Sequence, residues 1–198
     1  MIIQISNKIL DEFNIINNEY LVNKNYYNEK SGVQEYRLYS YLTTFFNNIF
    51  ILDIGTLDGR SAVALSHNTN NQVFSYDIYN HINNNDHVIY HKKNIKFNIK
   101  NVLDDLNEEF IKKIKIVMID IDHYETIETQ ILNKLKQLKF SGLVILDDIT
   151  KHPEPAINEC MNRLWNSIQD KKYDFTSYGH WSGTGVVVIN DDITFEFK

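Results

Sequence analysis

The sequence predicts an α/β fold built on a seven-stranded, mostly parallel sheet with one antiparallel strand and helices on both faces. Short apolar runs alternate with helical segments from about residue 49 onward, which is the pattern of parallel strands joined by helical crossovers. The last two runs follow each other without a helix between them, and such a closing pair adds one antiparallel strand. Two earlier runs end on pairs of acids, as expected of strands that reach the ligand-binding edge of a parallel sheet.

Seven segments have the pattern of strands, because they are short, apolar and bounded by polar residues or glycine. They span residues 49–54, 72–77, 95–98, 115–120, 143–147, 173–177 and 185–190. Four helices are expected between them, over 59–66, 105–111, 125–139 and from Pro155 through Trp165. The segment 125–139 is the best patterned of these, since its Ile and Leu residues recur on one side of a helix.

The first 48 residues read as helical. Ile5, Ile9, Phe13 and Ile16 recur at helical spacing, and a second stripe of large apolar residues runs from residue 36 to residue 45. No strand pattern is found before Phe50. Without a linker or an internal repeat, we expect one domain over 1–198, in which 1–48 form a helical N-terminal cap and 49–198 form the core that carries the functional residues.

The composition limits the classes of partner that the chain is expected to bind. A length of 198 residues with 43% hydrophobic and 23% charged residues is ordinary for one soluble domain. The formal charge of −6 disfavours nucleic acid as a partner, because nucleic-acid binders usually present a basic face. The single cysteine, Cys160, cannot form an internal disulfide, which fits a reducing compartment. Neither a signal-peptide pattern nor a membrane-spanning stretch is found, so a cytoplasmic location without a membrane partner is expected.

A glycine turn joins the first strand to the first helix. Gly55 permits a sharp turn and close approach of a ligand, and Gly59 opens the following helix, whose first N–H groups are free to bind it. Asp77 ends the second strand about 20 residues further on, where an acid binds ribose hydroxyls. Leu57 replaces the second glycine of a dinucleotide-binding turn, which favours a smaller nucleoside cofactor over NAD. The alternative is a plain strand–turn–helix connection.

Four acids follow two strands in the second half of the chain. Asp120 and Asp122 stand at the end of the fourth expected strand, and Asp147 and Asp148 stand at the end of the fifth. Because parallel strands end at the same edge of a sheet, these carboxylates are expected to gather there and to bind a hard cation such as Mg²⁺. The alternative is that Asp122 and Asp148 cap the helices that follow them.

The glycine turn, the acid of the first strand and the ribose acid together resemble class I S-adenosylmethionine-dependent methyltransferases, which have a Rossmann-like fold. The resemblance implies that the methionine end of the cofactor is lined by part of the turn and that the nucleoside end lies beyond it. The implied cofactor-binding residues are Asp53, Gly55, Thr56 and Ser61 at the methionine end, Asp77 at the ribose, Ile78 and Asn101 at the adenine, and Asp120. Many relatives have Asp at the position of Asn101, whose carbonyl oxygen can still accept a hydrogen bond from adenine.

The acid motifs, from Ile119 to Thr126 and from Ser141 to Asp148, resemble metal-dependent O-methyltransferases, most closely the macrocin and mycinamicin type that modifies sugars. The resemblance covers roughly residues 50 to 190. It implies that Asp120, Asp147 and Asp148 hold Mg²⁺ and that Asp122 is the general base. Ser141 departs from the pattern, since a second glycine is common there, and the short chain leaves less room for a lid over the acceptor.

Histidines and aromatic residues near these motifs offer further candidates. His123, His152 and His180 are alternative bases, although a single histidine is more often a hydrogen-bonded or surface residue. Trp181 is suited to stacking on a sugar or on adenine, or else to packing under a hairpin. Arg37 is suited to binding the diphosphate of a nucleotide-sugar, or else to a surface ion pair.

These observations predict a Mg²⁺-dependent O-methyltransferase that uses S-adenosylmethionine to methylate a sugar or nucleotide-sugar hydroxyl. Asp122, or His123 or His180 in its place, would take the proton. A catechol or phenol acceptor, a non-catalytic module that binds S-adenosylmethionine, and a metal-dependent hydrolase remain as alternatives. A homodimer is possible, with the helical N-terminus as the expected contact.

Overall fold

The fold is that of a doubly wound α/β protein. The structure is a computed structural model, and it describes residues 1–13, 19–20, 29–82 and 88–198. Its seven-stranded sheet has the order β4-β3-β2-β5-β6-β8-β7. The strands are β2 (Phe50–Ile54), β3 (Gln72–Asp77), β4 (Ile95–Ile99), β5 (Ile114–Ile119), β6 (Gly142–Leu146), β7 (Lys171–Asp174) and β8 (Gly185–Ile189).

The sheet is parallel except at β8. Strands β2 to β6 pair in parallel, whereas β8 runs antiparallel to both of its neighbours, β6 and β7. The predicted fold class is therefore confirmed, including its single antiparallel strand. Because the parallel strands all point the same way, the turns that leave β2, β3, β5 and β6 meet at one edge of the sheet.

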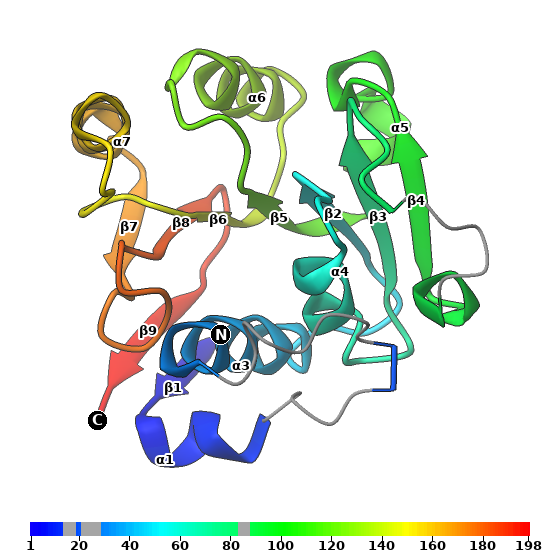
Figure 1. The fold of residues 1–198 in the computed structure, drawn as a ribbon, viewed down its shortest axis with the longest axis horizontal. Coiled ribbons are helices and arrows are strands. Elements are labelled where there is room, and N and C mark those ends of the chain that lie inside the picture. The colour runs from blue at the N-terminus through cyan, green and yellow to red at the C-terminus, as the bar shows by residue number, and fades with distance from the viewer. Residues whose placement is uncertain (14–18, 21–28, 83–87) are drawn as a thin grey trace.

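Helices cover both faces of the sheet (Figure 1). They are α1 (Asn7–Leu10), α3 (Lys30–Thr43), α4 (Arg60–Leu65), α5 (Glu108–Ile111), α6 (Thr126–Gln137) and α7 (Pro155–Ser167), with short 3₁₀ turns η1 (Asp11–Phe13), η2 (Val88–His91) and η3 (Val102–Asp104). Helices α3 and α4 lie on one face, and α5, α6 and α7 lie on the other. No helix in the described part of the chain is long and apolar enough to cross a membrane.

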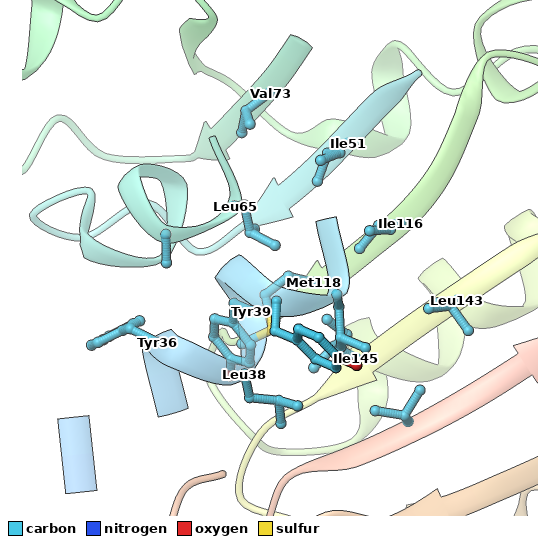
Figure 2. Packing of buried hydrophobic residues seen from close by; sticks show 14 of the residues in the cluster. Tyr36, Leu38, Tyr39, Ile51, Leu65, Val73, Ile116, Met118, Leu143 and Ile145 are labelled. Carbon is cyan, nitrogen blue, oxygen red and sulfur yellow. The ribbon is translucent and has the colours of Figure 1, made fainter. Parts of the chain in front are cut away.

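Each face has its own hydrophobic core, because neighbouring residues of a strand point to opposite faces. On β5, Ile116 and Met118 pack against α3 and α4, whereas Val117 packs with the residues of α6 and α7. Figure 2 shows the first core, where Leu38 and Tyr39 of α3 lie over the sheet. Burial of one such large apolar side chain stabilises a fold by about 1.5–3 kcal/mol. The two cores therefore hold α3 and the sheet in a defined relative position.

The N-terminal segment differs from the prediction of helix alone. Ile2–Ile5 form a strand, β1, which pairs in parallel with β9 (Thr194–Phe197) in a separate two-stranded sheet. The expectation that no strand precedes Phe50 was wrong, and β9 was missed altogether. Ile5 belongs to this strand rather than to a helix, which begins only at Asn7 after the cap residue Ser6. Ile16 lies outside the described residues. A strand of four residues is too short for its pattern to stand out in the sequence. Its pairing partner, β9, lies at the other end of the chain and gives no local signal either.

Helix α3 is the predicted second helix of the N-terminal region and is tied to the segment before it. The Arg37 guanidinium donates hydrogen bonds to Asp11 and to the side-chain oxygen of Asn7. Its side chain is only 5% exposed. An ion pair for Arg37 is thus confirmed, but the arginine is buried rather than at the surface, where the alternative had it.

One predicted helix is shorter than expected. Residues 105–111 form only the single turn of α5, Glu108–Ile111. The side chain of Asn107 accepts hydrogen bonds from the backbone N–H groups of Glu109 and Phe110, and this cap sets the start of the helix. The remaining helices and strands agree with the prediction to within a few residues at their ends.

Candidate active site

A cleft of about 470 Å³ lies where β2, β3 and β5 end. Its walls come from the turns after these strands and from the start of α6. Among the residues that line it are Gly55, Leu57, Asp77, Ile78, Asn101, Asp120 and Asp122. Five of the predicted cofactor-binding residues are thus brought together in one cleft, and Asp122, the predicted base, is part of the same wall.

Gly55 is the point of closest backbone packing in this cleft. Its φ is +104°, and a Cβ built there would lie 1.7 Å from the carbonyl oxygen of Asp120. Its own N–H donates to the carbonyl of Tyr76 on β3. Any side chain at this position would push the turn away from β5, so the sequence requires glycine here. The glycine turn and the first of the four acids are therefore in direct backbone contact.

Asp77 is held in the cleft by backbone donors. One carboxylate oxygen accepts the N–H of Leu57 from the glycine turn, at 3.1 Å, and the other accepts the N–H of Tyr79, at 3.0 Å. A carboxylate has further lone pairs on both oxygens, so these bonds orient it and still leave capacity for hydroxyl donors. The side chain is 13% exposed. This arrangement suits a residue that accepts hydrogen bonds from a diol.

Asn101 and Ile78 lie on the same wall of the cleft. The side-chain oxygen of Asn101 accepts the N–H of Leu103 and caps the short turn η3. This bond competes with the predicted hydrogen bond from adenine, although the oxygen has a second lone pair. Ile78 is 62% exposed, so a flat ring that binds there would cover an apolar surface that is otherwise in contact with water.

Three predicted residues lie beneath the cleft rather than in its lining. Asp53, Thr56 and Ser61 are buried, and none of them is among the lining residues. Ser75 donates to an Asp53 carboxylate oxygen at 2.6 Å and also shares a hydrogen bond with Thr56. Burial raises the pKa of Asp53 to about 7, against the opposing effect of the Ser75 hydrogen bond. The network supports the glycine turn from below.

The acids after β5 and β6 form a compact cluster. Donor oxygens of Asp120 and Asp147 lie within 4.8 Å of each other, and so do those of Asp147 and Asp148. Asp147 and Asp148 are buried. Burial raises the pKa of Asp147 to about 6, and the charges of Asp120 and Asp148 act in the same direction, whereas His180 opposes them. Like charges held this close are costly unless a cation or a proton lies among them.

The helix-cap alternative for these acids is wrong. Helix α6 begins after Glu125 and α7 begins after Glu154, so neither Asp122 nor Asp148 occupies a cap position. Asp148 instead has a φ of +57°, a left-handed conformation that Asp tolerates better than most residues. This left-handed residue lies just after β6, and the carboxylates of Asp148 and Asp147 lie close together there.

Two histidines face the acid cluster. The Nε2 atom of His123 lies 3.1 Å from Asp120 and 3.5 Å from Asp148. The Nδ1 atom of His180 lies 3.5 Å from Asp147 and 3.7 Å from Asp148. Burial by itself lowers both imidazole pKa values, but the hydrogen bond and charges of these acids outweigh it, and the pKa of His123 rises to about 9. The carboxylates thus favour the protonated form of both rings.

The third histidine and the late tryptophan lie around the same cluster. His152 Nε2 is 3.8 Å from Asp148, and its other ring nitrogen accepts the N–H of Glu154. Trp181 is 50% exposed, and its ring meets His180 edge-on with 5.6 Å between ring centroids. An exposed indole is not the packing residue under a hairpin that the alternative required. Its exposed ring lies beside His180, which itself faces the acid cluster.

Asp122 is separate from the cluster. It is exposed, and its only recorded hydrogen bond among the described residues is a long one from the N–H of Tyr124, at 3.4 Å. His123, by contrast, turns away from the cleft through a φ of +58° and is fixed by its N–H, which donates to Glu128 at 2.9 Å. Asp122 therefore lines the cleft, whereas the adjacent His123 lies against the acid cluster.

Glu35 is a further acid of the site that the sequence analysis missed. Its carboxylate, on α3, lies within 4.8 Å of donor oxygens of Asp120 and Asp147, and its side chain is buried. A signal was present in the sequence, because Glu35 stands on the same helical stripe as Leu38, Tyr39 and Leu42. A carboxylate on the apolar stripe of a helix is unusual and points to a buried partner.

The donor set of this cluster fits a hard divalent cation. It consists mainly of carboxylate oxygens, which Mg²⁺ and Mn²⁺ prefer, with imidazole nitrogen as the only softer donor. One oxygen each of Asp147 and Asp148 is buried and accepts no hydrogen bond of normal length within the described ranges. The cleft next to it fits a nucleoside cofactor in a similar way, since Asp77 offers acceptors and Ile78 offers an apolar surface.

The fold is similar to that of several solved structures. No protein-family model matches the sequence, and no curated protein matches it. The SAH-bound methyltransferase PaMTH1 of Podospora anserina matches with a TM-score of 0.58 and 13% identity, over 93% of this chain and 88% of that one. The O-methyltransferase of Bacillus cereus in complex with SAH matches with a TM-score of 0.54 and 16% identity, over 93% and 92% of the two chains. The chain therefore has the Rossmann-like fold of these methyltransferases.

Proposed function

We propose that this chain is an S-adenosylmethionine-dependent O-methyltransferase that acts on a small-molecule hydroxyl. The observation that carries the proposal is the double position of Asp120. This residue lines the cleft beside the glycine turn and also belongs to the buried acid cluster. A nucleoside site and a cation site that share one residue are suited to transfer a group from a cofactor to an acceptor held by the cation.

The cleft is proposed to bind S-adenosylmethionine, which supplies an electrophilic methyl group when bound. Asp77 accepts hydrogen bonds from the ribose hydroxyls, and Ile78 and Asn101 contact the adenine. The Gly55 turn brings backbone close to the methionine end, with Asp53, Thr56 and Ser61 supporting that turn from below. These residues hold the cofactor in one orientation, which is the main contribution that positioning makes to a displacement reaction.

Asp120, Asp147 and Asp148 are proposed to hold Mg²⁺ or another divalent cation. Such a cation lowers the pKa of a coordinated hydroxyl when bound, which matters most for sugar hydroxyls because they are weak acids. His123 and His180 pair with these acids and fix their orientation. Metal-site carboxylates commonly depend on such neighbouring partners for their geometry.

Asp122 is proposed as the general base. Its carboxylate is exposed and lines the cleft, so it is accessible to an acceptor that approaches the cofactor. His123 and His180 face the carboxylates of the cluster instead, and each is an alternative base only if its ring leaves those partners. The geometry thus ranks Asp122 first among the three candidates.

The acceptor is proposed to be a sugar, free or as part of a nucleotide-sugar. The exposed Trp181 beside the cluster offers an indole face on which a pyranose ring can stack. The same surface suits a catechol or another phenol, which is the second candidate acceptor. A homodimer through the N-terminal region remains a further proposal.

Two measurements test the proposal. Isothermal titration should show binding of S-adenosylmethionine to the wild-type chain, with a much weaker interaction for Asp77→Ala. Methyl transfer from labelled cofactor should then be measured over nucleotide-sugars, glycosides and catechols, with Mg²⁺ and with EDTA. Full activity in EDTA would exclude the cation role, and normal turnover by Asp122→Asn would exclude Asp122 as the base. Tight cofactor binding without transfer to any acceptor would favour a non-catalytic module.

A further inference from the structure

We propose that Glu35 of helix α3 is a fourth carboxylate ligand of the cation centre, so that an N-terminal helix completes the site. The inference rests on the cation site of the proposed function and extends it beyond the acids that follow the strands. It assigns to α3 a direct chemical role. The cation that such a set of oxygens selects is a hard one, Mg²⁺ or Mn²⁺.

The position of Glu35 is the first support. Its side chain is only 3% exposed, although a glutamate on a helix usually extends into water. Its carboxylate lies within 4.8 Å of donor oxygens of both Asp120 and Asp147. These three acids come from α3, from the turn after β5 and from the turn after β6. Three carboxylates from separate segments therefore converge on one point inside the protein.

Polar groups around that point provide the second support. The hydroxyl of Tyr39, one helical turn after Glu35, is fully buried and has no hydrogen-bond partner among the described residues. Burial raises the pKa of this hydroxyl, and the negative charges of Glu35, Asp147 and Asp120 act in the same direction. One buried oxygen of Asp147 likewise accepts no hydrogen bond of normal length within the described residues, and the nearby His180 ring nitrogen lies 3.5 Å from it. Buried polar groups are seldom left in this state, and a cation with its bound water would satisfy them.

The charge of the cluster is the third support. Glu35, Asp120, Asp147 and Asp148 carry four negative charges when ionised. The imidazole rings of His123 and His180 face these acids, and the ring of His152 lies 3.8 Å from Asp148. Carboxylates held this close repel one another unless a cation lies among them, and a divalent cation bound by all four would offset that repulsion.

Binding of Mn²⁺ to the full-length protein tests the inference without any turnover. Electron paramagnetic resonance measures free Mn²⁺ and hence the dissociation constant for wild type, Glu35→Gln, Asp147→Asn and Glu12→Gln. Glu12 is an exposed acid of the same N-terminal segment, so Glu12→Gln is the matched control. We expect Glu35→Gln to weaken binding about 10- to 100-fold, Asp147→Asn to weaken it at least as much, and Glu12→Gln to leave it unchanged.

The outcomes separate this inference from the proposed function. Wild-type affinity in Glu35→Gln, together with loss of binding in Asp147→Asn, would overturn the role of Glu35 and leave the strand-end acids as the cation site. Absence of Mn²⁺ binding by the wild-type chain would overturn both. Equal weakening by Glu12→Gln would also overturn the inference, because the effect would then be one of net charge.

Thermal unfolding provides a second measurement that a purely structural glutamate would not affect. A ligand that binds the folded state raises its melting temperature according to its affinity. We expect Mn²⁺ to raise the melting temperature of Glu35→Gln by much less than that of wild type, whereas equal shifts would contradict the inference. If Glu35→Gln does not fold in EDTA, Glu35→Asp decides the question. It keeps the charge and shortens the arm, and unchanged Mn²⁺ affinity in this variant would overturn the proposal.

Discussion

Replacement of Gly55 by alanine tests how the cleft is built. The glycine turn has a φ of +104° at this residue, and the new Cβ would lie 1.7 Å from the Asp120 carbonyl oxygen. Non-bonded heavy atoms are most stable at about 3.5–4.0 Å. The colliding atom belongs to the backbone of the chain after β5 and cannot rotate away. The turn and that segment must therefore separate, and the cleft must change shape.

Two costs contribute to the loss of stability in Gly55→Ala. A non-glycine residue in a sparsely populated backbone region costs about 1–3 kcal/mol. Overpacking of a filled site costs about 1–3 kcal/mol more. We expect a loss of about 2–6 kcal/mol in the free energy of unfolding, and at least about a tenfold loss of S-adenosylmethionine affinity, equivalent to about 1.4 kcal/mol. Urea unfolding followed by circular dichroism and isothermal titration measure the two quantities.

Gly59→Ala is the matched control for this experiment. Gly59 also has a positive φ, +82°, but the Cβ added there would meet the Cδ1 atom of Ile89 at 2.3 Å. That atom is the end of a side chain, which can change rotamer, and Gly59 is not among the residues that line the cleft. We expect about 1–2 kcal/mol of destabilisation and near-normal cofactor affinity. Equal costs for the two variants, or normal cofactor binding by Gly55→Ala, would refute the argument from backbone contact.

Three further predictions concern parts of the fold that support the site. The raised pKa of Asp53, about 7, means that the folded chain holds an extra proton between about pH 4 and pH 7, so this carboxyl lowers stability as the pH rises through that window. Asp53→Asn should flatten the decline of the urea midpoint across it, and an unchanged slope would contradict the burial argument. Arg37→Ala should cost about 2–3 kcal/mol and leave cofactor affinity within about twofold of wild type, because Arg37 bonds to Asp11 and Asn7; a large affinity loss would restore a ligand-binding role. Asn107→Ala should cost about 1 kcal/mol in chemical unfolding through loss of the α5 cap, and no measurable change would show that the cap is redundant.

Local patterns were enough to predict most of the fold. The apolar periodicity of the strands and of the longer helices can be recognised within a short stretch of sequence. Their alternation along the chain implies a parallel sheet. Short stretches of sequence could not predict β1 and β9, because these strands are short and pair with each other from opposite ends of the chain. The length of α5 was also overestimated, because the cap at Asn107 starts the helix three residues later than the apolar pattern predicts.

The candidate site was predictable where its residues stand directly at the ends of strands. Gly55, Asp77 and Asp120 follow apolar runs, and the structure places all three in one cleft. Asp53 was expected to line that cleft, but the inward direction of its side chain on β2 buries it beneath the turn. The side-chain direction depends on the pleat of the sheet and on the neighbouring Ser75, which a sequence pattern does not specify.

The succession of strands and helices along the chain, the glycine turn and the acids at two strand ends follow from local sequence, because each depends on nearby residues. Which distant groups meet depends on the packing of the whole fold. Glu35 and His180 are far from Asp147 in the chain, yet both lie beside it. Their meeting depends on how α3 and the loop before β8 pack against the sheet. Such contacts arise from the burial of whole faces, so no single segment of the sequence encodes them.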